Sequence, residues 1–204
     1  MSSAPAPGAM LRDNLWTNNP IFMQILGICS ALAVTNLLTN TMIMTIAVVG
    51  VMGMTNLTVS LIKSLIPRKV RMMVQTLIIA SYVIVVDIIL RAYLPDISRA
   101  LGPYVGLIIT NCIIMGRAEA FAQQNPPLLS VWDGVTSAFG YMGVLLAIAL
   151  IRELLGFGSL FGYQVMPEIF EPWIIMVMPP SAFFVLGIVI WIGKAIMERE
   201  GAPA

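Results

Sequence analysis

The sequence predicts an all-α, polytopic membrane protein, in which six transmembrane helices form two inverted three-helix repeats. Three observations favour this fold class. Of the 204 residues, 59% are hydrophobic and only 10% are charged. In soluble domains, about a quarter of the residues are charged. The apolar residues gather in six segments, of which the first and the fourth are short. These two short segments carry the only two cysteines of the chain, at matching positions.

The six apolar segments cover most of the chain, at residues 20–34, 41–62, 72–90, 103–115, 134–151 and 174–196. The second, third, fifth and sixth are long enough to cross a bilayer, which takes about 20 helical residues. The first and fourth would reach only about 20–23 Å of a hydrocarbon core of about 30 Å. We therefore expect helices 1 and 4 to be short or broken at the midplane. The stretches "TNLLTN" and "GRAEAF", which follow them, are expected to continue each as a second helical piece.

The two short segments resemble each other. Cys29 lies nine residues after Pro20, and Cys112 lies nine residues after Pro103. Proline suits the first turn of a helix, so each proline is expected to begin one. Each short segment precedes two longer ones, and a repeated unit of three helices must enter the membrane the second time from the opposite side. Nine helical residues rise about 13.5 Å, about half of the hydrocarbon thickness, so both cysteines are predicted near the midplane.

This pattern divides the chain into a tail (1–13), a first repeat (14–100), a second, inverted repeat (101–197) and a C-terminal tail (198–204), all within one membrane domain. Lysine and arginine mark the cytoplasmic side of membrane proteins. If the loop "KSLIPRKVR" is cytoplasmic, eight basic residues lie inside and three outside. Both termini are therefore predicted to be cytoplasmic.

Composition also excludes several functions. The chain has no histidine, which removes histidine-ligated haem, Cys/His zinc sites and histidine general bases. It contains no Gly-rich phosphate loop, and its net charge of +1 gives no basic surface for nucleic acid. We expect no catalytic residue and no complete active site in this chain.

The two cysteines allow three interpretations. They can be small buried hydrophobic residues, or a disulfide that would lock the two repeats together. They can also be metal ligands, since thiolates suit iron–sulfur clusters and zinc, both of which take four ligands. Because the chain supplies two, the metal interpretation requires a second protein, plausibly built on the same plan.

Five blocks carry a resemblance to a known family: "LGICSALAVT", "IASYVIVVDIILRAYLPDIS", "GLIITNCIIMGRAEAFA", "RELLGFGSLFG" and "PPSAFF". They resemble the D-type subunits of the sodium-translocating NADH:quinone oxidoreductase, the Nqr complex, over about residues 14–194. The E-type subunits of the Rnf complex, a ferredoxin:NAD oxidoreductase, are the near alternative. "CSALAVT" and "VIVVDIILRAYL" look more like the Nqr form.

The resemblance implies a component of a bacterial inner-membrane NADH:ubiquinone reductase that transports Na⁺. It implies that Cys29 and Cys112 share a 2Fe–2S cluster with two cysteines of a homologous E-type subunit of opposite orientation. The cluster would carry electrons from the F-type subunit to the FMN of the C-type subunit. FAD, FMN and quinone would belong to the A-, B-, C- and F-type subunits of the same complex.

A more remote alternative is a stand-alone inverted-repeat transporter, in which small polar residues near the cysteines bind an ion. The candidates are Ser30, Thr35, Thr110 and Asn111, although such residues more often form hydrogen bonds between helices. Glycines in the second and fifth helices are expected to allow close helix packing; they are Gly50, Gly53, Gly134, Gly140 and Gly143.

Charged residues inside apolar segments are candidates for ion coupling. Asp87 lies in "VIVVDIIL", with an ion pair to Arg91 at i+4 as the structural alternative. Asp133 is expected to open the fifth helix, where a carboxylate favours the N-terminal dipole. Arg152 and Glu153 are expected at an interfacial helix end, and Arg117 and Glu119 are expected to satisfy free backbone groups or to contact a neighbouring helix.

Overall fold

The computed structural model describes residues 14–15, 19–24, 26–93, 95–161, 163–164 and 173–199. Among them, the helices are α2 (Pro20–Gln24), α3 (Ile28–Val34), α4 (Leu38–Ile62), η2 (Arg68–Val70), α5 (Arg71–Tyr93), α6 (Pro95–Ile109), α7 (Cys112–Arg117), η3 (Ala118–Ala122), α8 (Pro127–Gly156), α9 (Ile174–Val177) and α10 (Pro179–Arg199). A two-residue antiparallel pair, β1 (Ser159–Leu160) and β2 (Tyr163–Gln164), follows α8. The predicted N-terminal tail, 1–13, lies outside the described residues.

Five helical stretches of the described chain are long and apolar enough to cross a membrane: Leu38–Ile62, Arg71–Tyr93, Tyr104–Ala122, Pro127–Gly156 and Pro179–Ile196. Large apolar side chains are exposed along several of them, as on Ile84, Trp191 and Phe184. A surface of this kind faces lipid rather than water in a membrane protein. The chain is therefore a helical, multi-pass membrane protein.

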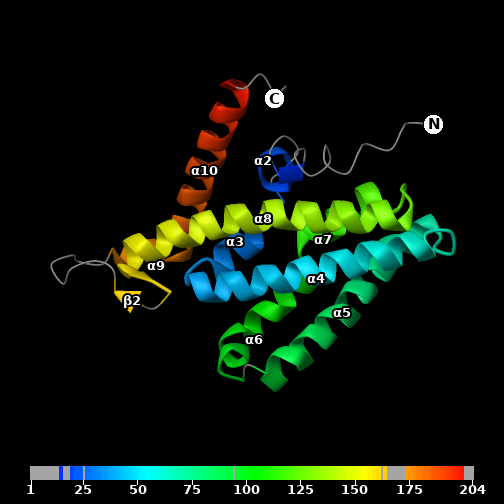
Figure 1. The fold of residues 1–204 in the computed structure, drawn as a ribbon, viewed down its shortest axis with the longest axis horizontal. Coiled ribbons are helices and arrows are strands. Elements are labelled where there is room, and N and C mark those ends of the chain that lie inside the picture. Colours follow the sequence, from blue (N-terminus) through cyan, green and yellow to red (C-terminus); the bar gives the residue numbers. More distant parts are fainter. Residues whose placement is uncertain are drawn as a thin grey trace.

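The helices α4 and α8 form the centre of the fold and run side by side in opposite directions (Figure 1). The start of α4 meets the end of α8, where the Leu38 N–H donates to the Glu153 carboxylate. The end of α4 meets the start of α8, where the Asn56 amide donates to the Ser130 carbonyl at 3.2 Å. The two helices are therefore antiparallel along their whole length.

Glycines permit this close packing, as the sequence predicts. An added Cβ on Gly53 would lie 3.3 Å from Val135, and one on Gly134 would lie 2.5 Å from Asn56 Nδ2. By contrast, Gly50 and Gly143 have nothing within 4 Å of such an atom. These two glycines therefore do not serve the packing within the described chain.

The other helices cover the two sides of this pair (Figure 1). The hairpin partner α5 packs on α4, and α6 packs on α4 and α5. On the other side, α10 contacts α8 and the short helices α2 and α3. The larger apolar core includes side chains from most of these elements: Ile21, Val34, Val48, Ile79, Ile113, Tyr141, Ile148 and Leu186.

Both short segments are broken, but the breaks lie before the cysteines rather than after them. In the first, Leu26 and Gly27 form a turn between α2 and α3; in the second, Thr110 and Asn111 separate α6 from α7. The continuation predicted from "GRAEAF" is confirmed, because Ala118–Ala122 form the π-helical turn η3. The one predicted from "TNLLTN" is wrong, because its first three residues form a connection and Leu38 begins α4.

The fourth segment also begins earlier than predicted. Helix α6 starts at Pro95, so Pro103 lies in its interior; of the two prolines predicted to begin the short segments, Pro20 alone does so. The charged stretch "PDISRAL" continues the helix because α6 is amphipathic and needs only one apolar face. The predicted boundary between the repeats, 100/101, falls inside α6. At the C-terminus, α10 extends to Arg199, and the rest of the predicted tail lies outside the described residues.

Candidate functional site

Each cysteine lies in the first turn after a helix break. Cys29 is the second residue of α3, which follows Gly27 in the left-handed conformation with φ 89°. Cys112 is the first residue of α7, and the side chain of Asn111 caps this helix by accepting from the Ile113 N–H. Both thiols are free and exposed in the isolated chain. Exposure is unusual for a free cysteine, which is among the most buried residue types.

The two breaks meet at one side chain, Tyr141, in the middle of α8. Its hydroxyl contacts the Ser30 hydroxyl, and it accepts from the Asn111 amide at 3.3 Å. Its ring packs against Gly27, where an added Cβ would lie 2.4 Å from the ring atom Cε2. Tyr141 is fully buried, and its two hydroxyl partners are sequence neighbours of the cysteines, because Ser30 follows Cys29 and Asn111 precedes Cys112. The fold therefore brings both cysteines around the same residue.

From Tyr141 the two cysteine-bearing segments lead to opposite ends of α8. Helix α3 leads to Thr35, which accepts a hydrogen bond from Arg152 at 2.6 Å near the end of α8. Helix α7 and η3 lead to Asn125, whose carbonyl accepts from Lys63 at 2.7 Å near the start of α8. The two segments therefore depart in opposite directions from the centre of α8.

The donor set for a metal consists of two thiols. The sequence contains no further cysteine and no histidine. Within the described ranges, no group of three or more His, Cys, Asp or Glu side chains is close enough to hold a metal ion. Sulfur ligands from this chain can therefore provide at most half of a four-thiolate site.

The small polar residues near the cysteines form internal hydrogen bonds, as the packing interpretation predicts. Ser30 donates to the Gly27 carbonyl at 2.8 Å, Thr35 donates to the Ala31 carbonyl, and Asn111 caps α7. Each of the three also bonds to α8, Ser30 and Asn111 through Tyr141 and Thr35 through Arg152.

Asp133 does not lie at the predicted position, and it forms a buried ion pair. Helix α8 begins at Pro127, so Asp133 is in its second turn and does not open it. Arg117 binds both oxygens of this carboxylate, with Nε at 3.0 Å from Oδ2. Asn14 completes the cluster by donating to Asp133 at 3.0 Å and accepting from Arg117 at 3.3 Å. Arg117 thus contacts a neighbouring helix, as predicted.

Arg152 and Glu153 lie close to the end of α8, as predicted, but they are covered by the protein itself. Both residues are 1% exposed. Arg152 donates to the carbonyls of Met176, Val177 and Met178, which joins α8 to the break between α9 and α10. Buried polar groups require such partners, and the carbonyls at a helix break provide them. The two residues therefore lie at a helix end that the rest of the protein buries.

The remaining charged candidates are ion-paired near the surface. Arg91 Nε lies 2.8 Å from Asp87 Oδ2, so the structural alternative for Asp87 is present. Glu119 accepts from Arg71 at 2.7 Å and from Gln75 at 2.8 Å. This carboxylate therefore contacts the neighbouring helix α5, as predicted.

The sequence interpretation overlooked Tyr141. The signal available was its setting in "SAFGYMG", where a tyrosine lies between two glycines in the middle of a long apolar helix. A buried tyrosine hydroxyl requires a partner, and in this position only other membrane helices can provide one. Its partners Ser30 and Asn111 lie 111 and 30 residues away in the sequence.

Comparison with known proteins gives a consistent result. A family model described as "Rnf-Nqr subunit, membrane protein" matches residues 8–190. A protein of Pseudomonas paraeruginosa is 50% identical over 94% of this chain and 88% of its own length. Proteins of Shewanella pealeana and Shewanella piezotolerans are 50% and 48% identical over 100% of this chain and 99% of theirs. All three carry the name of the D-type subunit of the Na(+)-translocating NADH-quinone reductase. The chain therefore belongs to the Rnf-Nqr family of membrane subunits.

Proposed function

We propose that Cys29 and Cys112 supply half of the ligands of a 2Fe–2S cluster, and that a homologous E-type subunit supplies the other two thiolates. One observation carries this proposal: both cysteines are exposed, and each lies directly after a helix break that is anchored on Tyr141. Cys112 also lies within a candidate membrane span, Tyr104–Ala122. An exposed thiol within a stretch that can cross the membrane favours a surface that another membrane protein covers.

The residues present fit such a group. Thiolates are the usual ligands of a 2Fe–2S cluster, which takes four of them. Two separate half-helices each present one thiolate, and Ser30 and Asn111 fix the chain beside them by hydrogen bonds to Tyr141. When bound, the cluster supplies a one-electron carrier between the flavin/iron–sulfur F-type subunit and the FMN of the C-type subunit. This chain's own part is to hold the two thiolates and to exclude water with its apolar core.

The names of the relatives support the assignment to a sodium-translocating NADH-quinone reductase. We propose that this chain is the D-type subunit of such a complex in a bacterial inner membrane, together with the A-, B-, C-, E- and F-type subunits. The E-type subunit of an Rnf complex is the alternative within the family. The relatives described above favour the Nqr assignment because each carries the D-type name.

We also propose that the chain consists of two inverted repeats, with both termini in the cytoplasm. Two structural features support this. The second helices of the two halves, α4 and α8, are antiparallel, and the two broken segments depart from Tyr141 toward opposite ends of α8. Inverted repeats place equivalent helices in opposite directions, with the functional site near the midplane.

Iron content of the purified complex tests the proposal. Replacing Cys112 by serine exchanges a soft thiolate for a poorer oxygen ligand. The Cys112→Ser complex should lose about one 2Fe–2S equivalent of iron and its quinone reduction, while the cluster in the F-type subunit remains. Normal iron content with normal quinone reduction would exclude the cluster and favour the transporter alternative.

A further inference from the structure

The hydroxyl of Tyr141 lies at the centre of a hydrogen-bonded chain whose direction can be assigned. The single hydroxyl proton of Ser30 goes to the Gly27 carbonyl at 2.8 Å. A serine hydroxyl has one proton to donate. Tyr141 must therefore donate its own proton to Ser30 Oγ, with which it is in contact.

The other side of the chain has the matching polarity. The Asn111 side-chain oxygen accepts from the Ile113 N–H at 3.2 Å, which places the amide nitrogen toward Tyr141 at 3.3 Å. A flipped amide would place two donors face to face at Ile113, so the Ile113 bond fixes this orientation. Tyr141 therefore accepts from Asn111 while it donates to Ser30.

The complete chain joins the starts of the two cysteine-bearing helices. It runs from the Ile113 N–H through Asn111, Tyr141 and Ser30 to the Gly27 carbonyl. Asn111 is the N-cap of α7, and Gly27 is the N-cap of α3. Both thiols are neighbours of this chain in the sequence, because one directly follows Asn111 and the other directly precedes Ser30.

We propose that Tyr141 is a positioning residue that fixes Cys29 relative to Cys112 and thereby shapes the half-site for the cluster. This inference rests on the proposed function. The ring of Tyr141 packs on Gly27, and its hydroxyl holds both segments. Partners of this kind orient metal ligands, and their loss typically lowers metal affinity about 10–100-fold. Tyr141 contacts neither sulfur in a hydrogen bond within the described residues, so it acts through Ser30 and Asn111.

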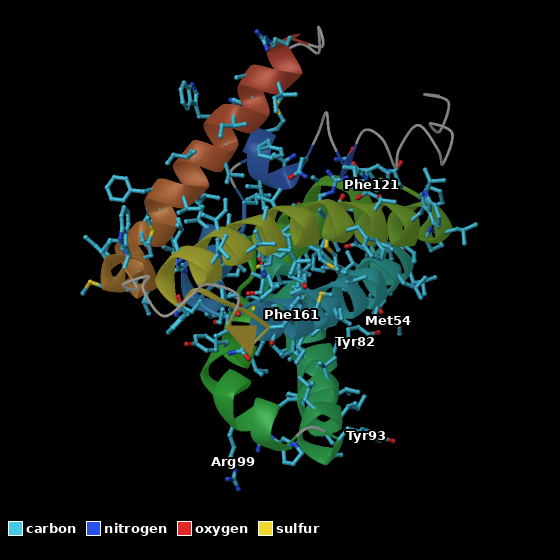
Figure 2. All side chains as sticks on the ribbon, turned by 60° about the vertical axis from the view of Figure 1, so that its left-hand side comes forward. Met54, Tyr82, Tyr93, Arg99, Phe121 and Phe161 are labelled. Carbon is cyan, nitrogen blue, oxygen red and sulfur yellow. The ribbon has the colours of Figure 1, made fainter. Side chains whose placement is uncertain are left out.

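The test compares two tyrosine variants of the whole complex. Tyr141→Phe keeps the ring but removes the hydroxyl. Tyr82→Phe is the matched control, because Tyr82 forms a similar hydroxyl contact, to Thr58 at 2.6 Å, between α5 and α4. Figure 2 labels Tyr82. Two readouts are measured besides activity: the rate at which a chelator removes iron, and the electron paramagnetic resonance signal of the reduced cluster.

We expect Tyr141→Phe to release iron about 10–100-fold faster than the wild type and to change the cluster signal, and Tyr82→Phe to change neither. Ser30→Ala should reproduce the effect, and the two changes combined should be less than additive because they interrupt the same chain. Equal behaviour of Tyr141→Phe and Tyr82→Phe would overturn the inference.

Two further outcomes are distinguishable. If Tyr141→Phe does not assemble, Ser30→Ala, which retains the tyrosine, decides by the same two readouts; an unchanged release rate then overturns the inference. If Cys112→Ser retains all iron, the proposed function itself fails, and the inference fails with it. Loss of iron in Cys112→Ser combined with a silent Tyr141→Phe rejects the positioning role alone.

Discussion

Arg117 binds both carboxylate oxygens of Asp133, and the two residues are buried between α7 and α8. They lie on either side of the 123–126 connection, so the pair closes the turn between the two helices. Removing one partner of such a pair leaves a buried charge without compensation, which costs about 3–5 kcal/mol.

We predict that Asp133→Asn lowers the thermal stability and the yield of the complex, whereas the double variant Arg117→Met/Asp133→Leu recovers most of the loss. Thermal unfolding of the purified complex measures both. The sequence also marks Asp133 as a candidate for ion coupling. An Asp133→Asn complex of wild-type stability that has lost its sodium dependence would support that role and contradict a structural one.

Asp87 is predicted to serve ion coupling more than folding. Its pair with Arg91 joins residues four apart near the exposed end of α5, and such pairs stabilise a helix by only about 0.2–0.5 kcal/mol. Asp87→Asn should therefore leave the complex assembled and weaken the stimulation of quinone reduction by sodium. Arg91→Gln breaks the same pair but keeps the carboxylate, so it should retain the stimulation. Wild-type sodium dependence in Asp87→Asn would make Asp87 structural.

Gly27 should tolerate no side chain. Its φ of 89° costs a residue with a Cβ about 1–2 kcal/mol, and the added atom would lie 2.4 Å from the Tyr141 ring. Gly27→Ala is therefore expected to destabilise the complex and to lower its melting temperature. The control is Gly50→Ala, in the interior of α4 with nothing within 4 Å, where alanine should be neutral or stabilising by about 0.5–1 kcal/mol. Equal melting temperatures for the two variants would contradict the requirement for glycine at position 27.

The inverted-repeat topology makes a prediction about sidedness. Tags at residue 204 and near Pro67 should both be cytoplasmic, and a tag near residue 162 should be on the opposite side. The Lys63–Asn125 contact already places the α4–α5 and η3–α8 connections at the same end of the molecule. The accessibility of each tag to a membrane-impermeant reagent shows on which side of the membrane it lies. Any other distribution of the three tags is incompatible with two inverted three-helix units.

Loss of a thiolate should also weaken assembly. If the cluster bridges this chain and its E-type partner, metal binding contributes to the association of the two. Cys29→Ser should therefore release the E-type partner more readily during purification than the wild type. Thr110→Ala is a suitable control, because it changes an exposed residue within the second break without removing a thiol. The composition of the complex after gel filtration measures the effect, and an intact complex without iron would separate cluster binding from assembly.

Much of the fold follows from the composition and from the lengths of the apolar segments. A long apolar segment identifies a membrane helix by itself, whatever the helix packs against. The spans around α4, α5, α8 and α10 were predictable for this reason. The breaks were predictable in existence but not in position. Gly27 adopts its left-handed conformation beside a ring that arrives from α8, more than a hundred residues later, and no local pattern contains that information.

The same limit applies to the charged residues. The sequence neighbours of Asp133 suggest an acid at the start of a helix. Its actual partner, Arg117, lies on the other side of a turn whose geometry the sequence does not show. Arg152 and Glu153 resemble an interfacial pair because charges usually end an apolar helix. Their burial depends on the carbonyls released at the break between α9 and α10, which compensate the arginine. Long-range compensation of this kind determines which charges enter the interior.

The antiparallel arrangement of α4 and α8 has an electrostatic consequence. Each long helix carries a macrodipole equivalent to about half an elementary charge at either end, and hydrocarbon does not screen it as water would. Because the 25 residues of α4 and the 30 residues of α8 run in opposite directions, the two dipoles oppose and largely cancel. The central pair therefore imposes little potential gradient along its axis, and a charge that crosses beside it is governed by the fixed side chains and by the membrane potential.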